Sequence, residues 1–228
     1  YVWALGDKAG TDAAFAKAAH VTRLDFHNNR LIPNAIEPRA ANASYSRSDD
    51  SYTLYVANQN PHVERLLMGA FVLGLPEHKL RVIAPDVGGG FGSKIFLYGE
   101  ETALVWASKR VGRPIKWTQT RREDFATTIH ARDHESEAEL AAKRDGTLLG
   151  IRGRSYTNFG AYLSMAAAMI PTVSFTHMLG GAYRMPAVQW EVTAAFTNTM
   201  SIDAVRGAGG SMAALILAMA AINYVNLA

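Results

Sequence analysis

A short run of glycines places the tightest limit on the fold of this 228-residue chain. Gly88, Gly89, Gly90 and Gly92 directly follow the apolar, β-prone segment Leu80–Ala84. Glycine adopts backbone conformations that other residues avoid, and it lets the chain approach a ligand closely. Successive loop amides can also turn towards an anion or an oxo group. We therefore predict a strand that ends in a ligand-facing loop, with a tight connection that binds nothing as the alternative.

The spacing of this loop departs from two common nucleotide-binding motifs. The dinucleotide fingerprint is Gly-x-Gly-x-x-Gly, and Gly92 comes one residue too early for it. The phosphate loop needs a lysine before its serine or threonine, whereas here Ser93 precedes Lys94. The loop taken alone therefore does not identify a ligand.

Two helices are predicted around the loop. The first is capped by Asn60, has Pro61 in its first position and ends at Gly74. Its apolar residues recur at helical spacing and predict one buried face, made of Val63, Leu66, Leu67, Ala70 and Phe71. The second helix runs from Glu100 to Val111, with acidic residues in its first turn, basic residues in its last and Gly112 beyond.

The rest of the chain mixes short helices with hairpins and shows no regular alternation of strands and helices. A first helix is expected over Thr11–Lys17, capped by Thr11 or Asp12. The expected strands, taken in chain order, are two around the turn Asn28-Asn29 (the second containing Leu31 and Ile32), Arg39–Tyr45, Tyr52–Ala57, Ile115–Thr118, a pair around Lys143–Gly146, and Val188–Thr199. This pattern predicts an α+β fold of mixed sheets and hairpins with packed helices.

Composition excludes several classes of function. The chain has no cysteine, so it carries no disulfide, thiolate metal site or iron–sulfur cluster. The net charge is +3 and the basic residues are scattered, which argues against nucleic-acid binding. The apolar run Met212–Ile222 is too short for a membrane span, which needs about 20 residues, and it is expected to form a buried helix.

Two histidines have the separation of helical zinc ligands. His130 and His134 are four residues apart. The alternation of charged and small residues over Glu135–Leu140 favours a strand, which would spread the two side chains apart. A zinc site is therefore not expected.

Several motifs in register resemble one enzyme family. They are Asn34–Arg39, Asn58–His62, Asp86–Lys94, Phe196–Thr199 and Ala204–Gly210. Their order and spacing resemble the large subunit of the molybdenum hydroxylases, which include xanthine dehydrogenases, aldehyde oxidases and CO-dehydrogenase-like enzymes. The resemblance runs from Tyr1 to about Gly210. It implies that residues 1–228 form part of the first molybdopterin-binding domain of a longer subunit.

The resemblance also assigns cofactor-binding residues. Gln59 resembles the glutamine that donates to an oxo group of the cofactor. Gly90, Phe91 and Gly92 match the loop whose backbone amide faces the molybdenum centre. Arg206 and Gly207 match a second loop that lies against the ligands of the metal. An amide, backbone N–H groups and an arginine can orient an oxo group without reacting with it. None of these residues is expected to ligate the metal directly. In the alternative interpretation, Gln59 only lies beside the cap residue Asn60 at the start of the helix.

Three positions depart from particular members of the family. Gly207 stands where CO dehydrogenases carry a copper-binding cysteine, so CO oxidation by that mechanism is not expected. Ile95 and Ala208 line the implied substrate pocket, where purine-type enzymes have a glutamate and an aromatic residue. The resemblance therefore favours aldehydes or N-heteroaromatic rings as substrates, hydroxylated with oxygen derived from water. After Gly210 the family has an amphipathic helix, whereas Ala213–Ala228 lacks charge.

The family's catalytic glutamate lies downstream of this segment, so we expect no catalytic residue here and no activity from the 228 residues alone. Glu37, Glu100 and Glu101 are not interpreted as substitutes.

The implied cofactor is molybdenum–molybdopterin, in its cytosine dinucleotide form for a bacterial protein. The implied partners are an iron–sulfur subunit or domain, an FAD subunit or domain and a small-molecule substrate. The expected compartment is the cytoplasm, with the periplasm as the alternative. Two rival hypotheses are an inactive homologue that acts as a scaffold and an unrelated anion- or nucleotide-binding module.

Overall fold

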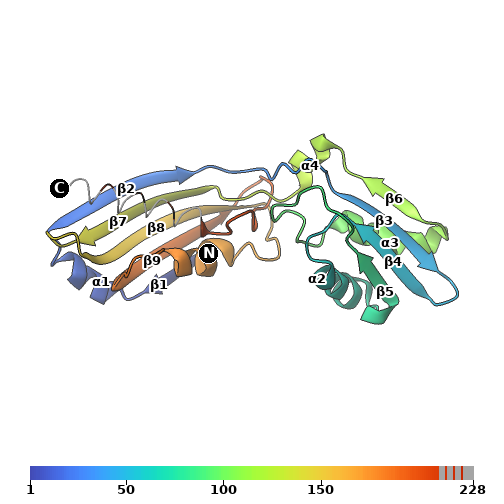
Figure 1. Ribbon diagram of the computed structural model, residues 1–228, viewed down its shortest axis with the longest axis horizontal. Helices are drawn as coiled ribbons and strands as arrows, with labels where there is room; N and C mark the ends of the chain where they lie inside the picture. The colour runs from blue at the N-terminus through green and yellow to red at the C-terminus, as the bar shows by residue number, and fades with distance from the viewer. Residues whose placement is uncertain (211–213, 215–217, 219–221, 223–228) are drawn as a thin grey trace. The chain divides into compact units, whose positions relative to one another are not determined.

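The computed structural model describes residues 1–210 together with Ala214, Ala218 and Ile222. The chain forms two compact units (Figure 1). The first combines Tyr1–Leu31 with Ile129–Ala228, and the second is the continuous segment Ile32–Thr128. Both contain strands and helices, which confirms the predicted α+β class. The buried helix expected over the apolar run Met212–Ile222 lies outside the described residues, apart from the three positions named above.

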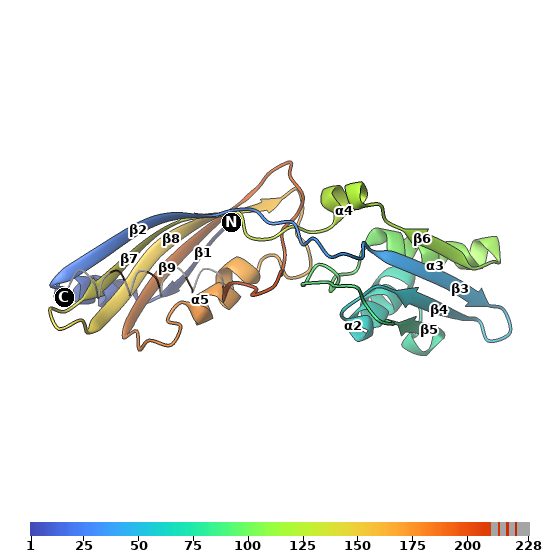
Figure 2. The same cartoon turned by 45° about the horizontal axis from the view of Figure 1, so that its top comes forward.

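The first unit is built on a five-stranded sheet with the order β1-β9-β8-β7-β2 (Figure 2). Its strands are β1 (Val2–Gly6), β2 (His20–Asn28), β7 (His134–Ala142), β8 (Leu148–Gly160) and β9 (Ala187–Phe196). Strands β8 and β9 pair in parallel, and the other neighbours are antiparallel. The strand pair predicted around Lys143–Gly146 is therefore confirmed as β7 and β8.

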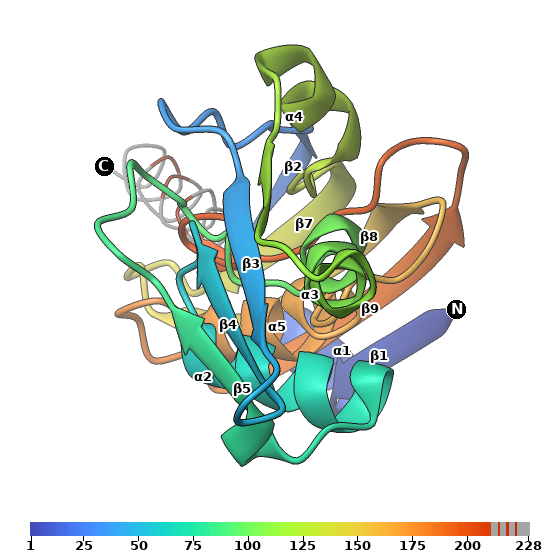
Figure 3. The same ribbon diagram turned by 90° about the vertical axis from the view of Figure 1, so that its right-hand side faces the viewer.

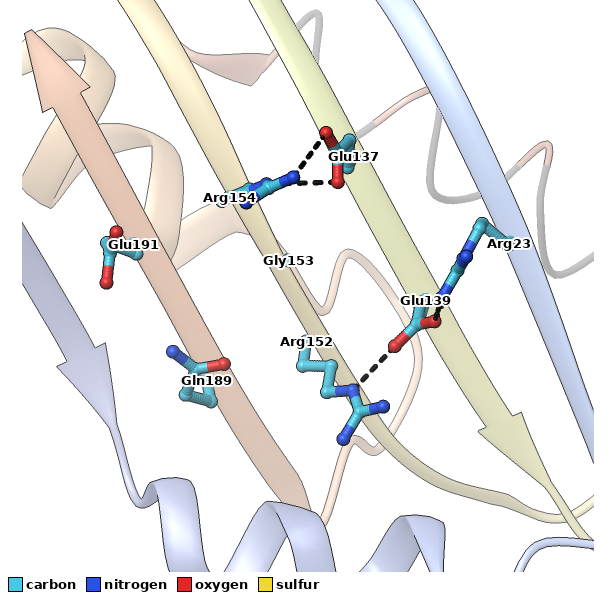
Figure 4. A pocket seen from close by; sticks show the side chains of 8 residues that line it. All are labelled: Arg23, Glu137, Glu139, Arg152, Gly153, Arg154, Gln189 and Glu191. Atoms are coloured by element: carbon cyan, nitrogen blue, oxygen red, sulfur yellow. Dashed lines mark hydrogen bonds and ion pairs between the residues drawn. The ribbon is translucent and has the colours of Figure 1, made fainter.

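The two faces of this sheet differ because the side chains alternate along each strand. One face buries Ala138, Leu140, Ile151, Trp190 and Val192 against Phe175 and Leu179. Phe175 lies in α5 (Phe175–Met178), which follows the π-helical segment Ile170–Ser174. The other face carries an ion-pair ladder in which Glu139 bridges Arg23 and Arg152, and Glu137 pairs with Arg154 (Figure 4). Helix α1 (Lys8–Phe15) contacts Arg152 on this charged face.

The second unit is built on a four-stranded sheet with the order β5-β4-β3-β6, of which Figure 3 shows β5, β4 and β3 side by side. Its strands are β3 (Ala40–Ser46), β4 (Ser51–Val56), β5 (Leu80–Ile83) and β6 (Ile115–Thr118). The predicted hairpin on either side of Ser48–Ser51 is confirmed as β3 and β4, and β5 runs parallel to β4. One face packs against helices around Leu54, Met68, Leu80 and Val105.

Each α-helix of the second unit follows one of its strands in the sequence. Helix α2 (Pro61–Leu66) continues as the π-helical segment Leu67–Leu73 and ends at Gly74 in the left-handed conformation. A short 3-10 turn, Glu77–Lys79, leads into β5. Helix α3 (Gly99–Val111) ends at Gly112, also left-handed, as predicted. Helix α4 (Arg121–Thr127) follows β6.

Three predictions about local structure are wrong. Helix α1 begins at Lys8 with Asp7 at its cap position, so Thr11 and Asp12 lie inside the helix. Strand β2 pairs with the distant β7, and Leu31 forms only an isolated bridge with Ala131, so the turn at Asn28-Asn29 is not a hairpin. The predicted apolar face of the helix after Asn60 is not its buried face. Leu66, Ala70 and Phe71 are exposed, and Glu64, Met68 and Gly69 face the core.

The helices of both units are short compared with the thickness of a lipid bilayer, which takes about 20 residues to span. In the part of the chain that the structure describes, none of them is both long enough and apolar enough to cross one.

Candidate functional site

The glycine loop after β5 adopts the unusual backbone that its composition predicts. Gly89 has φ +97° and Gly92 has φ +106°. Phe91 lies between them at φ +55°, and its side chain is 44% exposed. A left-handed conformation at a bulky residue costs on the order of 1–3 kcal/mol and persists only where its surroundings impose it. Such strain is typical of functional loops, and here it sets the direction of the neighbouring amides.

Gln59 is bound directly to this loop. Its Oε1 accepts hydrogen bonds from the N–H groups of Gly92 (2.9 Å) and Lys94 (3.3 Å). Its own N–H donates to the carbonyl of Lys94 (2.7 Å). A backbone N–H can only donate, so the side-chain oxygen must face the loop. The NH2 end of this exposed amide is therefore the end available to donate to a ligand.

Gly90 explains why Gln59 can approach so closely. A Cβ atom at Gly90 would lie 2.2 Å from Gln59 Oε1 and 2.4 Å from its Cδ. Real Cβ atoms do not approach other atoms at such distances, so a side chain at Gly90 would displace the glutamine or the loop. The glycine at this position is required by the packing of Gln59.

A buried lysine holds the other side of the loop. Lys94 is 2% exposed, and its Nζ donates to the carboxylate (2.7 Å) and the carbonyl (2.8 Å) of Glu37. The same carboxylate oxygen accepts from the N–H of Gly88 (2.8 Å). Partial burial acts to raise the pKa of Glu37, but the hydrogen bonds from Lys94 and Gly88 outweigh it and hold the pKa below its ordinary value. Glu37 is thus an engaged carboxylate and a poor candidate for a general base.

The second unit also contains a buried charged cluster that the sequence did not predict. The guanidinium of Arg39 is 1% exposed, hydrogen-bonds the Glu100 carboxylate (3.2 and 3.4 Å) and forms an ion pair with Glu101 (3.8 Å). Burial raises the pKa of Glu64 on α2, and the nearby Glu101 carboxylate adds to the shift. Burial also raises the pKa of Glu101. Glu100 and Glu101 lie in the first turn of α3, as predicted.

The second glycine loop lies in the first unit. Gly207 and Gly209 have φ +98° and +102°, and Ala208 between them has φ +20°. A Cβ at Gly209 would lie 3.0 Å from the backbone of Phe175, whereas one at Gly207 would meet open space. Asp203 anchors the entry to the loop by accepting from the N–H groups of Ala166 (2.9 Å) and Ala204 (2.6 Å). Arg206 itself is exposed.

The site residues taken from the sequence thus fall into two groups. Gln59, Gly90, Phe91 and Gly92 form one contiguous group in the second unit, with Ile95 half-buried just beyond them. Arg206, Gly207 and Ala208 belong to the first unit. The convergence of the two loops on one ligand stays a prediction.

The histidine pair forms no metal cluster. His134 begins strand β7 and is buried, and His130 forms a bridge with Ile202. Among residues 1–210 and the three further described positions, no group of three His, Cys, Asp or Glu side chains is arranged to hold a metal ion.

Comparison with known proteins gives consistent matches. Residues 1–223 match the molybdopterin cofactor-binding domain family. The carbon monoxide dehydrogenase large chain of Afipia carboxidovorans is 39% identical over 199 residues, which cover 87% of this chain and 24% of that protein. The nicotine 6-hydroxylase large subunit of Paenarthrobacter nicotinovorans is 34% identical over 202 residues, with 87% and 24% covered.

A solved structure of the CO dehydrogenase from Oligotropha carboxidovorans superposes with a TM-score of 0.88 at 36% identity, covering 99% of this chain and 28% of that one. The chain therefore spans about a quarter of the length of the relatives that it matches.

Proposed function

This chain belongs to the molybdopterin cofactor-binding domain family, and from that premise we propose that it forms part of the cofactor site in the large subunit of a molybdenum hydroxylase. The segment contributes the first molybdopterin-binding domain, in part, over residues 1–228. The observation that carries this proposal is the attachment of Gln59 to the loop around Phe91. It fixes the side-chain oxygen and leaves the amide NH2 as a donor.

The residues of this loop suit an oxo-bearing anionic group. They offer neutral donors on a strained backbone, and the nearby Glu37 carboxylate is already engaged by Lys94 and Gly88. The glycine positions leave room for close approach of a ligand to the backbone. When bound, the molybdenum cofactor supplies the two-electron oxidation and the transfer of oxygen derived from water. Gln59, together with the Phe91 amide, would orient that cofactor.

The proposed substrates are aldehydes or N-heteroaromatic rings, hydroxylated at carbon. The nicotine 6-hydroxylase among the relatives is a precedent for a heteroaromatic substrate. Gly207 stands where the family resemblance places the copper-binding cysteine of CO dehydrogenases, so we do not propose CO oxidation for this chain. Ile95 and Ala208 would make the pocket wall apolar.

The assembly proposed for the whole protein follows the same family. Electrons would leave through iron–sulfur and FAD partners on other subunits or domains, which is consistent with a segment that has no cysteine. The cofactor would be the cytosine dinucleotide form in a cytoplasmic bacterial protein.

The hypothesis of an unrelated nucleotide-binding module is set aside because the family match spans residues 1–223. A product of the native gene that ends near Ala228 and lacks turnover would instead support the scaffold hypothesis.

Substitution of Gln59 tests the proposed role of this side chain in the assembled enzyme. Gln59→Glu keeps an oxygen that accepts from Gly92 and Lys94 but removes the NH2 donor. We expect kcat to fall about a hundredfold or more, as for removal of a preorganised donor in other enzymes. Turnover of an aldehyde or a heteroaromatic substrate is measured together with bound molybdenum.

Two further variants make this test specific. Gln59→Ala removes both the acceptor and the donor, so kcat should fall at least as far. Gln189→Ala, on the charged face of the sheet in the other unit, is the matched control and should retain activity. Full turnover in Gln59→Glu at normal molybdenum content would contradict the donor role.

A further inference from the structure

Tyr98 lies at the junction between the glycine loop and helix α3, outside every motif assigned above. Its hydroxyl donates to the carbonyl oxygen of Ser93 (2.6 Å). Its ring is covered by the buried guanidinium of Arg39, which lies 3.7 Å from the ring centroid. Its backbone N–H donates to the carboxylate of Glu101 (3.3 Å). The side chain therefore connects the buried charged cluster to the loop.

The peptide that Tyr98 holds is the one that holds Gln59. The carbonyl of Ser93 and the N–H of Lys94 belong to the same peptide group, which is planar. The N–H of that group donates to Gln59 Oε1 (3.3 Å), while its carbonyl accepts from Tyr98. Fixing the carbonyl therefore fixes the direction of the N–H and, through it, the orientation of the glutamine amide.

Ser93 extends the same support to the strained part of the loop. Its Oγ (2.8 Å) and its N–H (3.0 Å) both donate to the carbonyl of Gly90. The side chain is buried, so these bonds are shielded from competing water. The position of Ser93 thus affects both the Gln59 contact and the backbone that leads into Phe91.

We propose that Tyr98 is a positioning residue for Gln59. Its ring packs against Arg39, and its hydroxyl holds the Ser93–Lys94 peptide, whose N–H donates to Gln59. This inference rests on the proposed function of Gln59. It adds a residue outside the cofactor-binding set that sets the direction in which the NH2 group donates. Phenylalanine at this position would keep the ring over Arg39 and remove the hydroxyl that donates to Ser93.

The test compares Tyr98→Phe with the parent in the assembled enzyme. Amide hydrogen exchange over residues 92–95 should become about five- to tenfold faster, because one hydrogen bond that closes the loop is lost. We expect kcat to fall about tenfold at unchanged KM and unchanged molybdenum content, since the donor is misdirected rather than removed. Tyr98→Leu, which also removes the ring from Arg39, should show larger changes of the same kind.

Tyr45→Phe is the matched control. It removes a hydroxyl bond of similar length, from Tyr45 to Asp50 (2.7 Å), elsewhere in the same unit. Loop exchange and kcat should stay at the parent values.

A double-mutant cycle separates positioning from general stability. In a Gln59→Ala background, Tyr98→Phe should cause little further loss of kcat, because the group that it positions is already gone. Fully additive losses, or unchanged exchange at residues 92–95 in Tyr98→Phe, would overturn the positioning role. A parent enzyme without molybdenum would instead overturn the proposed function. The exchange measurement needs no turnover, so the two failures are distinguishable.

Discussion

Replacing Arg39 by methionine is expected to destabilise the protein by about 3–5 kcal/mol. Arg39 is 1% exposed and is the cation that faces the buried Glu101 and the partly exposed Glu100. Removing it leaves carboxylates in a poorly solvated environment without their partner, which costs more than the pair itself contributes. Chemical denaturation of the parent and the variant at neutral pH measures this difference.

Two further variants test the cause of the loss. The double substitution Arg39→Met with Glu101→Gln removes the orphaned charge and should recover part of the stability. Lys109→Met breaks an exposed ion pair with Asp50 and should have a far smaller effect. Equal losses of unfolding free energy in Arg39→Met and Lys109→Met would contradict the claim that burial makes the Arg39 cluster more important for stability.

Acid is expected to destabilise the first unit through His134. This side chain is 3% exposed, and burial lowers its pKa to about 4 from the ordinary 6.5, with Arg132 adding to the shift and Asp133 opposing it. Between these values the unfolded chain binds the proton and the folded chain does not. Unfolding is therefore favoured as pH falls from 6.5 towards 4, by about 3 kcal/mol in all.

Glu64 and Glu101 act in the opposite direction, because burial raises their pKa values and acidification stabilises the folded state through them. The contribution of His134 must therefore be isolated by difference. Unfolding free energies of the parent and of His134→Gln are compared across pH 7 to 4, and the parent should lose more. His78→Gln removes an exposed imidazole and should follow the parent. Parallel curves for the parent and His134→Gln would contradict the prediction.

Local signals predicted the elements that carry the candidate site. Gly74 and Gly112 end their helices in the left-handed conformation. The glycine-rich segment around Phe91 is a strained loop that follows a strand. These features depend on the residue types themselves. The capping box of Thr120 and Glu123, which marks the start of α4, is a further local signal that the sequence carries.

Features that depend on long-range partners were not predictable from the sequence. Strand β2 pairs with residues more than a hundred positions away, so no local turn could reveal its register. The helix after Asn60 buries Glu64 beside Glu101, which in turn pairs with Arg39. The change to π-helical geometry after Leu66 also shifts the spacing of its apolar residues. The roles of Arg39 and Tyr98 arise only from the packing of distant segments.

We propose that Gln59 and the loop around Phe91 help to hold a molybdenum cofactor. Elemental analysis of the assembled protein, purified from its native source, tests that claim most directly. We expect stoichiometric molybdenum that is released together with a pterin. A catalytically active preparation without molybdenum would contradict it.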